Sequence, residues 1–350
     1  RAKIGLYLTS FNQTYSGKQT KRLKYLDEQI QPDGSFKTLT LPESSQNISV
    51  GQEDAPSIET LETSWRTAHL QGIATTQLKD LLQSRIKNYQ LSPTHLNAFT
   101  DLQYAGPEQF FFNTILRFPQ GPTADGQFGN AIHETLEWLQ YQLNEHQTLP
   151  NQGSIEDYFE KQLVAKRLSE SETALLLERG KRALRSYIGA KGSNFHSTDV
   201  AEHGFRNEGV LLGDVHLGGK IDRMEINKTE KTIVVVDYKT GKTYEKWASD
   251  LKLHKYKQQL YCYKLLIEGS HTYRGYTVTS GRLDFVEPDI NGKINSLELE
   301  FKETELERTT LLLRAMWQRV QSLDFPETNQ FDQTLSGVKQ FEDWLIEHIK

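Results

Sequence analysis

Apolar side chains recur at helical spacing through most of the first half of the chain. The segment 130–145 has one apolar face, made by Ile132, Leu136, Leu139 and Leu143. Residues three or four apart lie on the same side of a helix, so this segment is predicted to be a helix with one buried face. Similar spacing predicts helices at residues 20–29, 58–89, 155–163 and 170–188. Ser92 followed by Pro93 marks another helix start, because serine caps helices and proline fits their first turn.

The pattern changes after Val200, where short apolar runs typical of strands replace the helical spacing. These runs occupy residues 210–212, 215–221, 232–236, 272–278 and 282–286. Helical spacing returns at residues 255–268, 304–323 and 335–349. This order predicts an α/β fold, in which a small mixed sheet is flanked by helices and further helices are added at the N- and C-terminal ends.

Three segments stand apart from this pattern. Residues 4–10 form a β-like run, and residues 32–57, rich in Ser, Gln, Asp, Glu and Pro, are interpreted as a linker. Residues 121–129, with glycines at both ends, are predicted to be a loop. Because a new unit begins at Leu91, we expect a first region over residues 1–57, a helical connector over 58–90 and a domain over 91–350.

The composition limits the class of protein. Of 350 residues, 36% are hydrophobic and 25% charged, so a normal core is expected. The net charge of −5 excludes a generally basic nucleic-acid binder, so any DNA contact must come from a local patch. No apolar run approaches the roughly 20 residues of a membrane span, and no secretory signal is visible. We therefore expect no membrane partner and a cytoplasmic location. The single cysteine, Cys262, excludes an internal disulfide within this sequence.

Two acids and a lysine fall close together on two predicted strands. Asp237 and Lys239 are two positions apart, so on a strand they point to the same face. Asp222 lies far enough before Asp237 for one strand to end, turn at residues 227–230 and return, and we expect Asp222 to end the strand that starts near residue 215. Asp237 directly follows a run that is predicted to be buried, where a carboxylate is costly unless it is paired or bound to a metal.

These residues suit a divalent metal ion and an attacking water. Mg²⁺ prefers hard oxygen ligands, which Asp222, Asp237 and the carbonyl of Tyr238 can supply, and His133 can join them more readily with Mn²⁺. Lys239 would orient or deprotonate the water, or offset charge at phosphorus. Gln259 and Tyr263, four apart on one helix face, would hold Lys239 or grip a phosphate. This is the chemistry of phosphodiester cleavage.

Each of these residues also has a purely structural interpretation. An Asp-x-Lys pair on a strand is usually solvated, a histidine on a helix is usually structural, and Gln259 and Tyr263 can be simple helix packing. The order of acid, apolar strand, acid-x-lysine and glutamine-bearing helix favours the catalytic interpretation, because the whole succession is an improbable accident.

The motifs together resemble the RecB/AddB-type branch of the PD-(D/E)XK nuclease superfamily. The matching positions are Gly129-x-x-x-His133-x-x-x-Glu137, Glu202, Gly219-x-Ile221-Asp222-Arg223, Asp237-Tyr238-Lys239-Thr240-Gly241 and Gln259-Leu260-x-x-Tyr263. The resemblance covers the chain from about Leu91 onward and implies a restriction-endonuclease-like core. It also implies that His133, Asp222 and Asp237 bind metal, that Lys239 is catalytic and that Gln259 and Tyr263 form the additional motif of the branch.

A shorter resemblance concerns the first residues. Arg1-Ala2-Lys3-x-x-Leu6-Tyr7-Leu8-Thr9 is similar to the last conserved motif of UvrD/Rep-type superfamily 1 helicases. It implies that residues 1–57 are a helicase remnant and linker, and that the sequence is a piece of an ATP-binding helicase–nuclease whose motor domains are partners of this region. Many AddB-like domains carry a four-cysteine iron–sulfur cluster, but residues 102–107 and 325–338 contain no cysteine, so no cluster is expected.

The resulting hypothesis is a Mg²⁺- or Mn²⁺-dependent DNA exonuclease that acts on single strands in recombination and repair. Two alternatives remain open. One is a catalytically silent nuclease fold that binds or splits DNA, and the other is a domain that only binds a protein partner.

Overall fold

The computed structural model describes residues 75–349. The predictions for residues 4–10, 20–29, 32–57 and 58–74 lie outside this part of the chain, as does the helicase-like motif at Arg1. The described helices are α3 Thr75–Lys87, α4 Pro93–Phe99, α5 Gly106–Phe110, α6 Ala124–His146, α7 Gln152–Ala165, α8 Glu170–Lys191, α9 Leu251–Glu268, α10 Glu303–Ser322 and α11 Leu335–Glu347. None of them combines the length and apolarity that a membrane crossing requires.

The main sheet has five strands in the order β1-β4-β5-β6-β7. The strands are β1 Val200–Gly204, β4 Lys220–Asn227, β5 Thr232–Lys239, β6 Thr277–Phe285 and β7 Ser296–Glu300. Strands β5 and β6 are parallel and the other neighbours antiparallel, so the sheet is mixed. Helix α9 lies between β5 and β6 in the chain and provides the long connection that parallel strands need. Strands β2 Leu211–Leu212 and β3 Val215–His216 form a separate two-stranded sheet.

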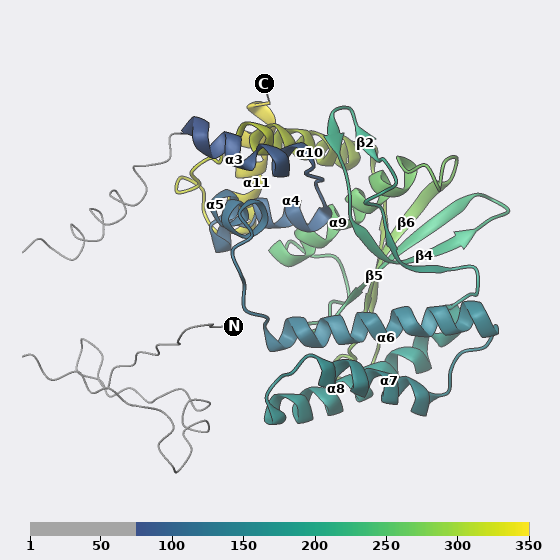
Figure 1. The fold of residues 1–350 in the computed structure, drawn as a ribbon. Coiled ribbons are helices and arrows are strands. Elements are labelled where there is room, and N and C mark those ends of the chain that lie inside the picture. Colours follow the sequence, from purple (N-terminus) through teal and green to yellow (C-terminus); the bar gives the residue numbers. More distant parts are fainter. Residues whose placement is uncertain (1–74, 350) are drawn as a thin grey trace, which may run out of the picture. The chain divides into compact units, whose positions relative to one another are not determined.

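Helices cover both faces of the sheet, and α6, α7 and α8 form one of these layers (Figure 1). The other layer includes α4, α9, α10 and α11, and each layer packs on its own cluster of buried side chains. Strand β5 contributes to both clusters. Val235 belongs to the cluster beneath α9, and Val236 and Tyr238, on the opposite face of the strand, belong to the cluster beneath α6 and α8. The predicted mixed α/β fold, with a small mixed sheet flanked by helices, is confirmed.

Helix α6 begins at Ala124, six positions before the predicted start, so the predicted loop over residues 121–129 is confirmed for residues 121–123 and wrong from Ala124 onward. The hydroxyl of Thr123 caps the helix by accepting from the N–H of Gly126. Gly129 then lies inside the helix, where a Cβ atom would come within 3.2 Å of Oγ1 of Thr240. The glycine therefore allows α6 to pass close to the end of β5, rather than breaking the helix.

The strands after α9 also differ from the prediction. A single strand, β6, replaces the two predicted at residues 272–278 and 282–286. Gly281 lies in the middle of β6, and a Cβ there would come within 3.1 Å of Leu260 on α9. Close packing of the helix explains this glycine, which does not interrupt the strand. The edge strands β1 and β7 are rich in polar residues and were not predicted.

Candidate active site

The antiparallel pairing of β4 and β5 brings Asp222 beside Asp237. Asp222 is the third residue of β4, not the last residue of a strand as predicted, because residues 215–216 belong to the separate two-stranded sheet. Arg223 pairs with Val236, so the beginning of β4 adjoins the end of β5. The backbone N–H of Tyr238 donates to Oδ2 of Asp222 over 2.8 Å, which ties the carboxylate to the neighbouring strand.

Asp237, Lys239, Gln259 and Tyr263 form a closed ring of contacts between β5 and α9. The Nζ of Lys239 lies 2.5 Å from Oδ2 of Asp237 and donates over 2.8 Å to Oε1 of Gln259. The amide of Gln259 donates to the hydroxyl of Tyr263 over 2.6 Å. That hydroxyl donates to Oδ1 of Asp237 over 3.0 Å and closes the ring.

His133 reaches the other acid of the site from α6. Its Nδ1 lies 3.4 Å from Oδ1 of Asp222 and 3.7 Å from Oε1 of Glu202. Ligand atoms of these three side chains all lie within 4.8 Å of one another, which is a spacing that can hold a metal ion. The structure therefore groups Glu202 with His133 and Asp222, whereas the carboxylate of Asp237 faces Lys239 and Tyr263.

Glu202 is a candidate ligand to which sequence reasoning assigned no role. Ala201 pairs with Arg223 and His203 with Ile221, so Glu202 falls opposite Asp222. Its φ angle is +51°, in the left-handed region that non-glycine residues rarely adopt, least of all within a strand. Its Oε2 lies 2.5 Å from the Nζ of Lys220. The only sequence signal was its place in the family motif.

The electrostatic environment separates the two aspartates. Burial raises the pKa of Asp237 above its usual value, and the ammonium of Lys239 offsets this only in part. Burial acts on Asp222 in the same direction, but the imidazole of His133 and the ammonium of Lys239 bring its pKa below the usual range. Burial opposes a charge on His133, yet the carboxylates of Asp222 and Glu202 raise its pKa to about 10.

The residues present suit a hard divalent cation. Oδ2 of Asp237 is buried and faces the Lys239 ammonium, whose Nζ lies 2.5 Å away. Oδ1 of Asp222 faces the imidazole, while its other oxygen is held by Tyr238. Carboxylate oxygens with an imidazole form a donor set that Mg²⁺ or Mn²⁺ accepts. The ring of Tyr238 packs edge-on against His133 at 5.9 Å, and the proposed use of its carbonyl as a ligand stays a prediction.

A salt bridge behind the site fixes the turn that follows Lys239. The guanidinium of Arg179 on α8 donates to both carboxylate oxygens of Glu287, at 2.7 and 2.8 Å. Oε1 of Glu287 also accepts from the backbone N–H of Gly241 over 2.5 Å. Val286 donates its N–H to the carbonyl of Lys239 over 3.0 Å. These bonds restrict the backbone on which Lys239 is placed.

Comparison with known proteins identifies the family. The family model of the PD-(D/E)XK nuclease superfamily matches residues 90–335. The chain belongs to this superfamily. The matched region contains every residue of the candidate site, from His133 on α6 to Tyr263 on α9. Membership in the PD-(D/E)XK superfamily indicates a metal-dependent nuclease, and the fold with its acidic cluster agrees with that. No curated protein matches the sequence.

Proposed function

We propose that this chain hydrolyses phosphodiester bonds of DNA with a divalent metal ion at the site formed by Asp222, Asp237 and Lys239. The main support is the placement of Lys239 beside Asp237 within a PD-(D/E)XK domain. Asp237-Tyr238-Lys239 matches the (D/E)-x-K of the superfamily name. Asp222 follows Ile221, where the name has proline, so the departure concerns the residue before the acid and not the acid itself.

The side chains of the site have two proposed roles, which are metal binding and the chemistry at the phosphate. Asp222, Asp237, His133 and Glu202 would hold the metal, and the Tyr238 carbonyl is a further candidate. When bound, a divalent ion supplies Lewis acidity to the phosphoryl oxygen and lowers the pKa of a water. The ammonium of Lys239 would orient the attacking water and offset negative charge at phosphorus. Gln259 and Tyr263 hold that ammonium and the Asp237 carboxylate in fixed positions.

The finer assignment rests on the motif resemblance. We propose an exonuclease that acts on single-stranded DNA, within a RecB/AddB-type helicase–nuclease of recombination and repair located in the cytoplasm. Residues 91–350 would be the nuclease domain, residues 58–90 a helical connector and residues 1–57 a helicase remnant and linker. We propose Mg²⁺ or Mn²⁺ as cofactor and no iron–sulfur cluster.

The alternative is a catalytically silent nuclease fold that binds DNA or a protein. The acids and the lysine are all present, Lys239 contacts Asp237 and His133 contacts Asp222, which favours the active enzyme. Digestion of end-labelled single-stranded DNA with Mg²⁺, with Mn²⁺ and with a chelator would test this. We expect cleavage only with metal and its loss in Lys239→Ala. Lys228→Ala, in the turn between β4 and β5, serves as the control.

Two results would contradict the proposal. Absence of cleavage with either ion, in a folded protein, would favour the silent module. Equal cleavage by Lys239→Ala and the unsubstituted chain would show that Lys239 is not catalytic. The pattern of products would separate exonuclease from endonuclease action, since an exonuclease removes nucleotides progressively from an end.

A further inference from the structure

A groove of about 810 Å³ adjoins the candidate active site. Two of its lining residues, Lys220 and Tyr263, contact the site directly. Lys220 pairs with Glu202, and Tyr263 donates to Asp237. The rest of the groove is lined by residues at the end of α3 and the start of α4, by residues of the segment after α5, and by Arg206, Gly218 and Gly219. The groove therefore ends at two side chains that each contact an acid of the site.

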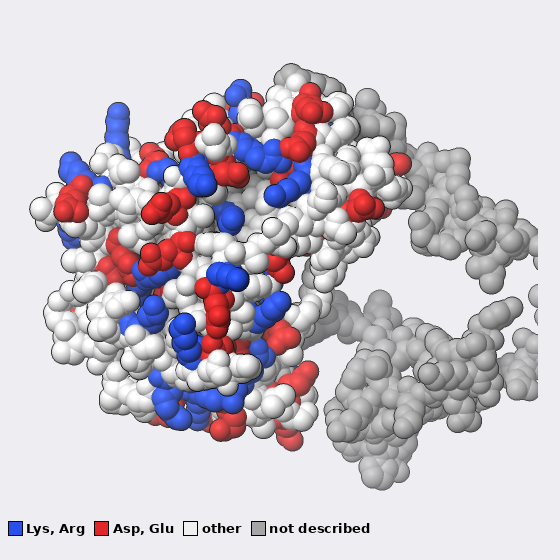
Figure 2. Space-filling model, turned by 180° about the vertical axis from the view of Figure 1, so that it is seen from behind, with Lys and Arg blue, Asp and Glu red and all other residues white. Residues whose placement is uncertain are grey.

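The charge of the groove differs from that of the chain. Its cationic side chains are Arg85, Arg117, Arg206 and Lys220, and no Asp or Glu lines it. The chain as a whole has 46 acidic residues against 41 Lys and Arg. The face of the protein in Figure 2 shows blue and red side chains interspersed, without a large area of one sign. The groove is thus a local cationic feature on a mixed surface.

Two of the four cations have no protein partner in the part of the chain that the structure describes. Arg85 donates to the carbonyls of Ile115 and Leu116, at 2.9 and 3.1 Å, and Lys220 pairs with Glu202. The guanidiniums of Arg117 and Arg206 form no hydrogen bond or ion pair with any described residue. Guanidiniums bind phosphate oxygens with two parallel hydrogen bonds, so both are suited to an anionic ligand.

The backbone at Arg117 is in an unusual conformation. Its φ angle is +60°, in the left-handed region where glycine is preferred, and it follows the π-helical turn Phe111–Ile115 and Leu116. The carbonyls of that turn are held by Arg85, so the segment that presents Arg117 is anchored to α3. An arginine at a position that favours glycine is consistent with a use for its side chain.

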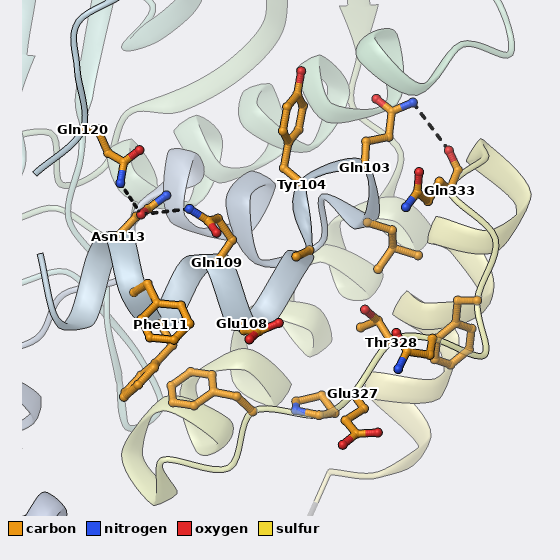
Figure 3. A pocket seen from close by; sticks show the side chains of 17 residues that line it. Gln103, Tyr104, Glu108, Gln109, Phe111, Asn113, Gln120, Glu327, Thr328 and Gln333 are labelled. Atoms are coloured by element: carbon orange, nitrogen blue, oxygen red, sulfur yellow. Dashed lines mark hydrogen bonds between the residues drawn. The ribbon is translucent and has the colours of Figure 1, made fainter. Parts of the chain in front are cut away.

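A second, larger hollow provides the contrast. It has a volume of about 1130 Å³ and lies between residues 102–120 and residues 325–333, as seen in Figure 3. Its lining includes Glu108 and Glu327 but no Lys or Arg, and Gln109 and Gln120 both donate to Asn113 within it. Negative charge disfavours a phosphate backbone there, although the hollow is larger. The cationic groove is the better match for nucleic acid.

The size and lining of the groove fit one strand. Its volume is within the range of about 300–1,000 Å³ found for small-molecule pockets, which suits a few nucleotides. Tyr89 and His95 line its wall and stack on each other, with ring centroids 5.4 Å apart, while the Tyr89 ring also stacks on Trp317 at 5.9 Å. Single-stranded DNA is bound by such combinations of cations and aromatic rings.

We propose that this groove guides a single DNA strand to the active site and that Arg117 and Arg206 bind its phosphates. The proposal rests on the nuclease function proposed above. The strand would run past Tyr89 and His95 and reach the acids beside Lys220. Arg117 and Arg206 are therefore binding residues that lie outside the catalytic ring of Asp237, Lys239, Gln259 and Tyr263.

Binding without cleavage tests the groove separately from the chemistry. The probe is a fluorescein-labelled oligothymidine with a chelator present, and anisotropy is measured at several salt concentrations. For Arg117→Ala combined with Arg206→Ala, we expect the affinity to fall on the order of tenfold. The slope of the logarithm of the binding constant against the logarithm of salt concentration should become shallower by about 0.7 for each lost phosphate contact. Lys239→Ala in the same assay should bind well while failing to cleave with metal.

Two further variants exclude trivial causes. Arg117→Gly removes the guanidinium at a backbone position that favours glycine, so this variant is expected to keep its fold. Arg274→Ala removes an exposed arginine that does not line the groove and should bind like the unsubstituted chain. Thermal unfolding of each variant verifies its fold.

Each outcome separates the two proposals. Unchanged binding by Arg117→Gly and by the double variant would overturn the groove, even in an active nuclease. Tighter binding of a duplex than of oligothymidine, with the same dependence on the two arginines, would overturn the single-strand assignment. Binding that depends on these arginines without cleavage under any metal condition would support the groove and refute the nuclease function.

Discussion

The Nζ atom of Lys239 lies 2.5 Å from Oδ2 of Asp237, two positions earlier on the same strand. The lysine also lies 4.1 Å from the centre of the Tyr256 ring, a cation–π contact from α9. An ammonium held by a carboxylate, an amide oxygen and an aromatic face has little freedom to move. Its position is therefore set before substrate arrives, which is the arrangement that preorganised electrostatic catalysis requires.

Removing the hydroxyl of Tyr263 should break the ring of contacts between β5 and α9 without leaving a cavity in the core. In Tyr263→Phe, the buried Oδ1 of Asp237 loses a donor and the half-buried amide of Gln259 loses an acceptor. We expect the cleavage rate to fall by about tenfold to a hundredfold, corresponding to roughly 1–3 kcal/mol. Tyr261→Phe is the control, since the Tyr261 hydroxyl on the same helix accepts from the N–H of Lys302 instead. Equal rates for the two variants would argue against a role for the ring.

Metal binding should depend on Glu202 as well as on the two aspartates. Calorimetric titration with Mn²⁺ is expected to show affinity reduced by at least about tenfold in Asp222→Asn, Asp237→Asn and Glu202→Gln, because each removes a charged ligand. Glu208→Gln is a matched control, since Glu208 also lies beside a histidine, His203, at 3.2 Å. If affinity for Mn²⁺ is unchanged in Glu202→Gln but lost in Asp237→Asn, Glu202 is not a ligand. The ligands would then be His133 and the two aspartates, as predicted from the sequence.

Stability should fall in mild acid because of His95. Burial lowers the pKa of His95 from 6.5 to about 4, and its Nδ1 lies 3.0 Å from the hydroxyl of Tyr89. The folded state keeps this imidazole neutral, whereas the unfolded chain binds a proton below pH 6.5. The stabilisation is complete above pH 6.5 and is lost as the pH falls toward 4, by about 3 kcal/mol in total.

The measurement is urea unfolding across this pH range for the unsubstituted chain and for His95→Gln, which cannot titrate. The difference in unfolding free energy between them should change in favour of the variant as the pH falls. His146→Gln, at an exposed position, should follow the unsubstituted chain. Parallel curves for all three proteins would exclude His95 as the source of acid sensitivity.

The packing of α7 against α8 should be sensitive to a single methyl group. A Cβ atom on Gly180 would come within 2.0 Å of the ring of Phe159, which is fully buried and cannot move aside. Gly180→Ala should destabilise the protein by about 1–2 kcal/mol, because overpacking outweighs the helix propensity of alanine. Gly189→Ala, on the same helix with open space around it, should instead stabilise by up to about 1 kcal/mol. Denaturant unfolding measures both.

The parts of the structure that depend on local pattern were predictable. The helix start at Ser92 and Pro93 and the strand ending at Lys239 both follow from neighbouring residues. Gln259 and Tyr263, predicted to share a helix face, do meet Lys239 and Asp237, because α9 packs on the face of β5 that carries those two residues. Strand β7 had a usable signal, the alternation of Leu297 and Leu299 with acidic residues.

Other features depend on contacts that no local pattern encodes. The glycines before residue 130 indicated a loop, but Gly129 accommodates Thr240, which follows strand β5 more than a hundred positions later in the chain. Strand β1 has no apolar alternation, since Glu202 and His203 occupy its centre. Its pairing with β4, which places Glu202 opposite Asp222, becomes visible only in three dimensions.

The left-handed backbone of Glu202 implies a trade-off between thermal stability and activity in this domain. A glycine at that position would adopt the same conformation at no steric cost, so the fold itself would tolerate or even prefer it. Such a replacement would also remove the carboxylate that faces His133. If Glu202 is a ligand, selection for heat resistance alone would drive this strand toward an inactive protein.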